Sequence, residues 1–198
     1  MSKGNQRDRT DLAGYEVLVG VGGGIAAYKV CPVVSRLVQR GCGVTVAMTE
    51  AAARFVAPLT FQTLTHRQVF ITLWATDGHY DPHHLSLTER ADLFLVAPAT
   101  ANLIGKFSSG IADDLVSTLM TARDCPALLA PAMNARMWEN PVVQRNVATL
   151  RESGFRFVGP EEGRLACGTI GRGRMAEPET ILEAVAKMLK EHPPGSAS

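Results

Sequence analysis

Short apolar runs alternate along the chain with stretches of helical spacing. Runs typical of buried strands lie at residues 15–21, 44–48, 93–97, 127–130 and 155–158. Between them, apolar residues recur every three or four positions, which predicts helices over 25–39, 49–55, 100–107, 111–121, 137–153 and 178–190. Strands that alternate with helices predict a single-domain α/β fold, a doubly wound parallel sheet (Rossmann or flavodoxin-like) with helices on both faces.

Three segments interrupt this pattern. Pro32 falls inside the first helical stretch and predicts a kink there. Residues 56–82 are irregular and predict short helices and a loop, with helical spacing returning at 85–91. Residues 159–177 predict a long loop, and seven of the thirteen residues from Gly163 to Met175 are Gly or Arg. With so few apolar groups, this last part predicts a mobile flap that closes over a ligand.

Composition excludes several classes of protein. The 198 residues are 46% hydrophobic and 20% charged, with a formal net charge of +1, so no basic footprint points to nucleic acid. No apolar run is long enough to span a bilayer, and the N-terminus lacks the apolar core of a signal peptide. We therefore expect a cytoplasmic protein with one domain at 14–190 and disordered tails at 1–13 and 191–198.

The four cysteines favour a reducing compartment. None is paired as Cys-x-x-Cys, and no Cys/His cluster has the spacing of a zinc site, so we expect no metal. Cys31, Cys42 and Cys125 lie in or beside apolar patterns and are expected to be small core residues. Cys167 lies in the long loop, where it could be a functional thiol or an incidental one.

Ligands of parallel sheets bind at the carboxyl ends of the strands, and the unusual residues of this chain follow predicted strands. The first group is the glycine triplet at 22–24, whose N–H groups could approach a phosphate. A dinucleotide fingerprint would need a third glycine where Ile25 stands and an acid near Met48 and Thr49. A mononucleotide is therefore favoured over NAD, and a tight turn without any ligand is the alternative.

Two further loops offer small and polar side chains. Residues 98–102 leave room for a flat ring, and Thr100 and Asn102 could hydrogen-bond to it, although Thr100 could equally cap a helix. Asn134 follows the run at 127–130 and could cap a helix or hold a ligand. Met137 and Trp138, one turn further on, are expected to form a soft apolar wall.

His83 and His84 could provide acid–base catalysis because the pKa of histidine is near neutral. Surface or core histidines are nevertheless more common. Residue types alone therefore do not assign either side chain a role.

Considered together, the order and spacing of these motifs resemble the homo-oligomeric flavin-containing cysteine decarboxylase family. The likeness runs from about residue 17 to residue 181. It is carried by Gly23-Gly24-Ile25-Ala26-Ala27-Tyr28-Lys29, His84-Leu85-Ser86-Leu87, Ala97-Pro98-Ala99-Thr100-Ala101-Asn102, Gly110-Ile111-Ala112-Asp113-Asp114, Pro131-Ala132-Met133-Asn134 with Met137-Trp138, and Leu165-Ala166-Cys167-Gly168 with Gly173-Arg174-Met175.

The resemblance implies FMN as cofactor and a trimer-based assembly with the flavin at subunit contacts. It implies oxidation of the cysteinyl thiol of 4′-phosphopantothenoylcysteine to a thioaldehyde, loss of the carboxylate as carbon dioxide, and reduction of the resulting enethiolate to 4′-phosphopantetheine. This reaction belongs to coenzyme A biosynthesis and involves no net redox change.

Site roles follow from the same resemblance. His84 is implied as the catalytic base and Cys167 as the acid that protonates the enethiolate. Asn134 is implied to hold the substrate carboxylate, with Met137 and Arg174 also on the substrate side. Contacts to the flavin are implied for Gly23, Gly24, Thr49, Phe55, Pro98, Ala99, Thr100, Ala101 and Asn102. The family often has a hydroxyl residue at position 22 or 24, and this chain has glycine at both.

Three other functions remain as alternatives. A peptidyl-cysteine decarboxylase of lantibiotic-type maturation shares these motifs. A non-catalytic flavoprotein, such as a phosphatase regulatory subunit, keeps the fold but would be expected to lose Asn134 or Cys167. A flavin prenyltransferase has a related fold without the Asn134–Trp138 motif and the Cys167 loop.

Overall fold

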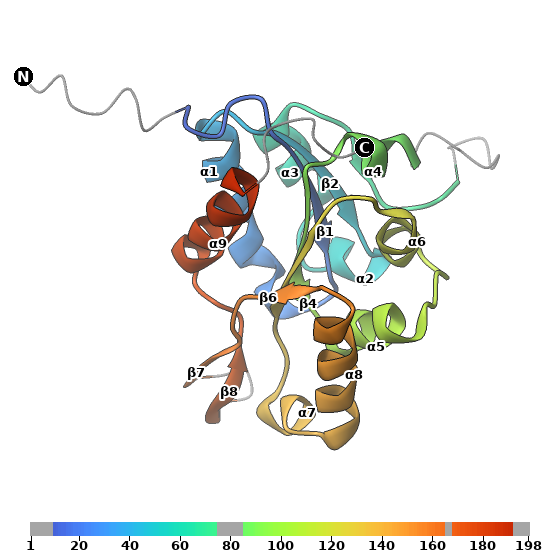
Figure 1. Cartoon of the computed structure of the whole chain (residues 1–198). Helices are drawn as coiled ribbons and strands as arrows, with labels where there is room; N and C mark the ends of the chain where they lie inside the picture. Colours follow the sequence, from blue (N-terminus) through green and yellow to red (C-terminus); the bar gives the residue numbers. More distant parts are fainter. Residues whose placement is uncertain (1–9, 75–84, 165–167, 192–198) are drawn as a thin grey trace, which may run out of the picture.

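A six-stranded parallel sheet forms the centre of the molecule in the computed structural model, which describes residues 10–74, 85–164 and 168–191. The strand order is β3-β2-β1-β4-β5-β6, which confirms the predicted doubly wound fold (Figure 1). The strands are β1 (Glu16–Val21), β2 (Gly43–Met48), β3 (Val69–Phe70), β4 (Leu93–Ala99), β5 (Ala127–Pro131) and β6 (Arg156–Phe157).

Helices cover both faces of this sheet. One face is covered by α1 (Val30–Gln39), α3 (Pro58–Thr65) and α9 (Pro178–Lys190), and the other by α4 (Leu85–Arg90), α5 (Ala101–Ser109), α6 (Leu115–Ala122) and α8 (Pro141–Glu152). A 3-10 helix, η2 (Ile25–Lys29), precedes α1, and the short helices α2 (Glu50–Ala53) and α7 (Ala135–Trp138) follow β2 and β5. In the described part of the chain, no helix has the length and apolar character needed to cross a membrane.

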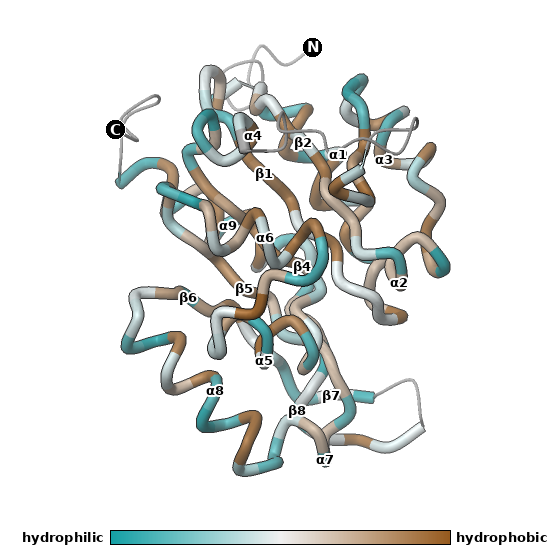
Figure 2. Tube along the Cα trace, turned by 90° about the vertical axis from the view of Figure 1, so that its right-hand side faces the viewer, coloured by the Kyte–Doolittle hydropathy of each residue, from teal (hydrophilic) through white to brown (hydrophobic). Residues whose placement is uncertain are grey.

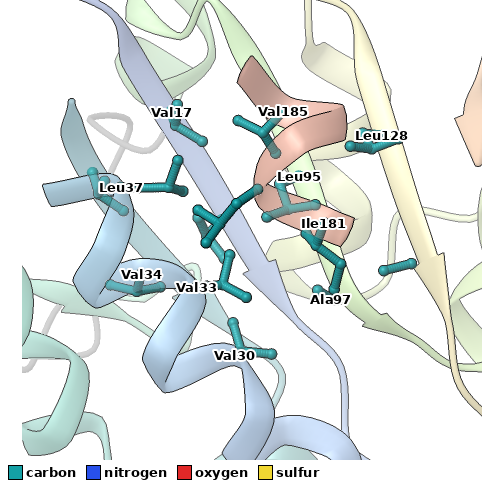
Figure 3. Close-up of a cluster of buried hydrophobic side chains, with 14 of the residues drawn as sticks. Val17, Val30, Val33, Val34, Leu37, Leu95, Ala97, Leu128, Ile181 and Val185 are labelled. Carbon is teal, nitrogen blue, oxygen red and sulfur yellow. The ribbon is translucent and has the colours of Figure 1, made fainter. Parts of the chain in front are cut away.

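Alternate strand residues fill two separate cores. Val17 and Leu95 face the α1–α9 side, whereas Leu18 and Phe94 face the α5–α6 side. Figure 3 shows side chains of α1 and α9, among them Val33 and Ile181, packed over β1 and β4. Strands buried on both faces read as continuous apolar runs, and the central strand β1 is mostly brown in Figure 2. This double burial explains why the pattern located them.

The kink expected at Pro32 is absent, and that prediction was wrong. Residues 25–29 form η2 and the α-helix begins only at Val30, so Pro32 lies in its first turn. A first-turn residue has no intrahelical acceptor for its N–H, so proline costs the helix little there.

The predicted boundary of the N-terminal tail was also too late in the chain. Leu12 is fully buried in the core beneath α1, and its N–H donates to the Arg40 carbonyl at 3.1 Å. A single apolar residue in a polar stretch gave no periodic signal. The rest of the predicted tails, apart from residues 10–13 and Glu191, lies outside the described residues.

The segment expected to be a long loop contains a β-hairpin. Strand β7 (Glu161–Arg164) pairs antiparallel with β8 (Ile170–Arg174), with Glu161 opposite Arg174 and Arg164 opposite Ile170. Backbone pairing organises these residues despite their few apolar side chains. In Figure 1 the hairpin lies at the same end of the molecule as α7.

Asp11 ties the N-terminal turn to α1 and α9. Its carboxylate accepts two hydrogen bonds from Arg40, at 2.8 and 2.6 Å, and one from Lys190 Nζ at 3.0 Å. The Arg40 hydrogen bonds, with that of Lys190, hold the pKa of Asp11 well below its ordinary value despite partial burial. The carboxylate thus stabilises the fold while it is ionised.

We predict that Asp11→Asn lowers the free energy of unfolding at pH 7 by about 1–3 kcal/mol, the usual range for charged hydrogen bonds. Because the folded-state pKa is depressed, this contribution is complete above the unfolded pKa of about 4 and is lost as the pH falls toward the folded value. Urea unfolding of both proteins between pH 7 and pH 3 measures it. A difference that stays constant over this range would contradict the assignment.

Candidate functional site

A cleft of about 1380 Å³ opens at the carboxyl ends of the strands. The sheet order reverses between β1 and β4, and the loops that follow these two strands form part of the lining. This topological switch point is where doubly wound sheets bind ligands. Of the residues proposed from sequence, the lining contains Gly23, Gly24, Thr49, Thr100, Ala101, Asn102, Asn134, Met137 and Arg174.

The glycine loop lies against the neighbouring elements with little free space. A Cβ on Gly22 would overlap the Pro98 carbonyl oxygen, and a Cβ on Gly23 would overlap the Ala51 side chain. Gly24 differs, since the nearest atom to its Cβ position is Thr100 Cγ2 at 3.6 Å and its backbone is extended. Only Gly24 of these three therefore has room for a side chain within the described structure.

Hydroxyl caps hold the next two loops. Thr49 accepts from the Ala52 N–H at 3.1 Å and begins α2, as the sequence predicted. Thr100 accepts from the Leu103 N–H at 3.3 Å and begins α5. Pro98 and Ala99 are buried in the last part of β4 and do not contribute to the lining. They lie directly before Thr100, the first lining residue of that loop.

Asn134 sits where β8 docks on the loop after β5. Its side-chain oxygen accepts from the Arg136 N–H at 2.9 Å and caps α7. The Met133 N–H on the same turn donates to the Gly173 carbonyl at 2.9 Å. A Cβ on Gly173 would overlap the Met133 carbonyl oxygen, so the hairpin and this turn meet through their backbones.

Carboxylates neutralise much of the positive charge in the cleft. Glu177 contacts both Lys29 Nζ, at 3.2 Å, and Arg174 Nη2, at 3.0 Å, and Arg174 also reaches Glu161 at 3.2 Å. Arg174 Nε is buried and has no hydrogen-bond partner in the described structure. The chain Lys29–Glu177–Arg174–Glu161 thus joins η2 to the hairpin and to the start of α9.

Lys106 makes the second charged cluster. Its ammonium lies 2.5 Å from both Asp113 and Asp114, and Asp114 also caps α6. Burial opposes the charge of Lys106, but hydrogen bonds to both aspartates raise its pKa. The same ammonium lowers the pKa of Asp113. Both members of the pair stay ionised at neutral pH.

Besides Pro98 and Ala99, two more residues proposed from sequence do not line the cleft. Phe55 is 50% exposed and is not among the lining residues. Trp138 was expected in the apolar wall, and that prediction was wrong: it is 5% exposed and packs in the core beneath α8. Only Met137 of that pair lines the cleft. Adjacent helix positions point in different directions, which the sequence interpretation had overlooked.

The proposed catalytic pair, His84 and Cys167, and the neighbouring His83 lie outside the described residues. Gly168, the residue after Cys167, lines the cleft. The other three thiols are not activated: burial raises the pKa of Cys31, raises that of Cys42 to about 12 and raises that of Cys125 to about 11. No group of three metal-ligating side chains is present in the described ranges.

Sequence reasoning missed part of the lining. Residues 71–74 come from the irregular segment after α3, and its exposed Trp74 was the only chemical signal there. The cleft is also lined by Glu50, Lys106 and Arg164, to which the sequence patterns had given no role in the site. The helical spacing of Lys106 relative to Asn102, one turn apart, could have indicated it.

The flavoprotein family model matches residues 5–190. The chain belongs to the flavoprotein family.

Two curated relatives of this flavoprotein are named coenzyme A biosynthesis bifunctional protein CoaBC. The protein of Bacillus subtilis (strain 168) is 47% identical over 175 residues, which cover 88% of this chain and 43% of that protein. The protein of Escherichia coli (strain K12) is 44% identical over 172 residues, covering 87% and 42%. This flavoprotein therefore spans less than half the length of these relatives.

Solved structures agree with the family assignment. One is a PPC decarboxylase in which a cysteine is replaced by serine, complexed with pantothenoylaminoethenethiol. It is 30% identical, with a TM-score of 0.78, and the match covers 90% of this chain and 99% of that one. The FMN-dependent cysteine decarboxylase SpaF is 33% identical, with a TM-score of 0.74 and coverage of 91% and 98%. The FMN binding protein AtHal3 is 30% identical, with a TM-score of 0.76 and coverage of 91% and 99%.

Two substitutions in the glycine loop of this flavoprotein test how tightly it packs. Gly23→Ala is expected to lower the free energy of unfolding by about 1–3 kcal/mol, since the new methyl group meets Ala51. Gly24→Ala is expected to stay within about 0.5 kcal/mol of the parent protein. Urea unfolding measures both. Equal losses in the two variants would show that the loop is not packed as described.

Proposed function

We propose that this chain is an FMN-dependent decarboxylase that converts 4′-phosphopantothenoylcysteine to 4′-phosphopantetheine in coenzyme A biosynthesis. The observation that carries the proposal is the single cleft shared by the glycine loop, the Thr100–Asn102 loop, the Asn134 turn and the β8 hairpin. The coenzyme A biosynthesis proteins at 47% and 44% identity support it, as does the PPC decarboxylase structure.

The cleft suits FMN together with a substrate. Its volume of about 1380 Å³ exceeds the roughly 300–1,000 Å³ of an ordinary small-molecule pocket, so two ligands can share it. Gly23 and Gly24 bring backbone close to the cleft, where N–H groups can hold the phosphate without a side-chain hydroxyl. Thr49, Thr100 and Asn102 provide polar groups for the rest of the cofactor. When bound, FMN supplies a reversible two-electron acceptor.

Asn134, Met137 and Arg174 would contact the substrate. The amide of Asn134 can donate to the cysteinyl carboxylate while its oxygen caps α7. Met137 is 48% exposed and offers an apolar wall. Because Glu161 and Glu177 already compensate the charge of Arg174, its guanidinium suits a neutral acceptor, such as an amide carbonyl.

Proton transfers are assigned to His84 and Cys167 on the family resemblance. His84 would accept the proton released as the thiol end of the substrate is oxidised. Cys167 would then protonate the enethiolate that remains after decarboxylation, a step that needs the thiol and not the thiolate. The pantothenoylaminoethenethiol bound to a Cys→Ser variant of a PPC decarboxylase supports a late role for a cysteine.

A homo-oligomer, built from trimers, is part of the proposal. Ile25, Tyr28, Phe55, Leu59 and Trp74 are each at least half exposed in the single chain, and three of the five line the cleft. Exposed apolar groups at a ligand site are typical of subunit contacts. In such an assembly Phe55 would reach the cofactor of a neighbouring subunit. A cytoplasmic location follows from the proposed pathway.

Peptidyl-cysteine decarboxylation is the second candidate, supported by the 33% identity to SpaF. We predict that the purified protein is yellow, binds FMN, and releases carbon dioxide from 4′-phosphopantothenoylcysteine at least about tenfold faster than from a peptide ending in cysteine. Parallel carbon dioxide assays with the two substrates measure this. Faster release from the peptide would favour the second candidate, and colourless folded protein that binds no FMN would refute both.

For Cys167→Ser we predict near-normal release of carbon dioxide with accumulation of the enethiol, which has two hydrogens fewer than 4′-phosphopantetheine. Mass spectrometry of the product distinguishes the two compounds. Cys31→Ser is the control, because Cys31 does not line the cleft and burial raises its pKa. Saturated product at the normal rate from Cys167→Ser would exclude this thiol as the proton donor.

A further inference from the structure

Four cationic side chains line the cleft in the described residues: Lys29, Lys106, Arg164 and Arg174. Three of them have carboxylate partners, Lys29 and Arg174 through Glu177 and Lys106 through Asp113 and Asp114. Arg164 is exposed, and no carboxylate of the described residues lies within 4.0 Å of it. Among the four described cations of the lining, Arg164 is the one without a neighbouring carboxylate.

A ligand phosphate would meet a different local charge at each of these four groups. At Lys29 or Arg174 it would meet the negative charge of Glu177 within a few ångströms, and at Lys106 that of two aspartates. At Arg164 it would meet positive charge without a nearby carboxylate in the described structure. Guanidinium also matches phosphate geometry, since two N–H groups can donate to two oxygens.

The position of Arg164 fits the far end of an extended substrate. Gly173, near one end of β8, is hydrogen-bonded to the turn that bears Asn134. Arg164 pairs with Ile170 at the other end of the hairpin, three strand residues or about 10 Å away. A substrate whose carboxylate lies at Asn134 can therefore follow the hairpin and bring a distal group to Arg164.

We propose that Arg164 binds the terminal phosphate of the substrate and sets the preference for the phosphorylated over the unphosphorylated compound. This inference rests on the proposed function and goes beyond it by naming the group that selects the phosphate. The hairpin contains a matched control: Arg172 lies on β8, is also exposed and does not line the cleft.

The test compares steady-state kinetics on 4′-phosphopantothenoylcysteine and pantothenoylcysteine for the FMN-loaded parent, Arg164→Gln, Arg164→Lys and Arg172→Gln. We expect Arg164→Gln to lose about 10–100-fold in kcat/KM on the phosphorylated substrate only, mainly through KM. Arg164→Lys should recover part of the loss, and Arg172→Gln should match the parent on both substrates. Calorimetry with 4′-phosphopantetheine and pantetheine should show the same selective loss in binding.

Three outcomes would overturn the inference. An equal loss on both substrates would mean that Arg164 acts on the hairpin, and no loss on either would mean that the phosphate binds elsewhere. An Arg172→Gln variant as impaired as Arg164→Gln would indicate a general effect of hairpin charge. A parent protein that decarboxylates neither compound is a different result, because it refutes the proposed function itself.

Discussion

The site depends on how closely two backbones approach at the centre of the sheet. Where the strand order reverses, the loops after β1 and β4 must begin side by side, and Gly22 leaves no space between itself and the Pro98 carbonyl. Gly20, two residues earlier in β1, also has little room, because its Cβ position lies 3.0 Å from the ring of Phe94 on β4. Gly22 does not line the cleft, whereas Gly23 and Gly24, the next two residues, do. A side chain at Gly20 or Gly22 would push β1 and β4 apart and distort both walls of the site.

Glycine has the same use at the hairpin. Gly173 meets the carbonyl of Met133, and a Cβ on Gly171 would lie 2.8 Å from Ala135 Cβ. A strand with almost no apolar side chains is thereby held against α7 through its backbone, and the ion pairs of Arg174 fasten its other side to α9. Apolar patterns detect elements that bury side chains, so the sequence interpretation read this segment as a flap. Its glycines at positions 171 and 173 allow the close contact.

The parts of the fold that could be predicted share one physical property. Strands β4 and β5 are buried and apolar along their whole length, and β1 and β2 are mostly so, which makes their runs stand out. Strand β3 has two half-buried residues and leaves no trace. Thr49 and Thr100 were predictable as caps because a hydroxyl before a helix has one obvious partner. Leu12, Trp138 and Lys106 were not, since each depends on which neighbour the folded chain brings to it. The same holds for the charges of the cleft: the sequence shows where cations are, but only the fold shows which of them have carboxylates beside them.

Asn134 shows how a local and a tertiary requirement can be met by one side chain. The sequence left two alternatives, a cap for the following helix or a group that holds a ligand. The oxygen of the amide accepts from the Arg136 N–H, which holds that oxygen at the start of α7. The Met133–Gly173 hydrogen bond holds the turn that bears this side chain in place. In the proposed site the amide would hold the substrate carboxylate through its nitrogen while its oxygen caps α7, so the two alternatives are compatible.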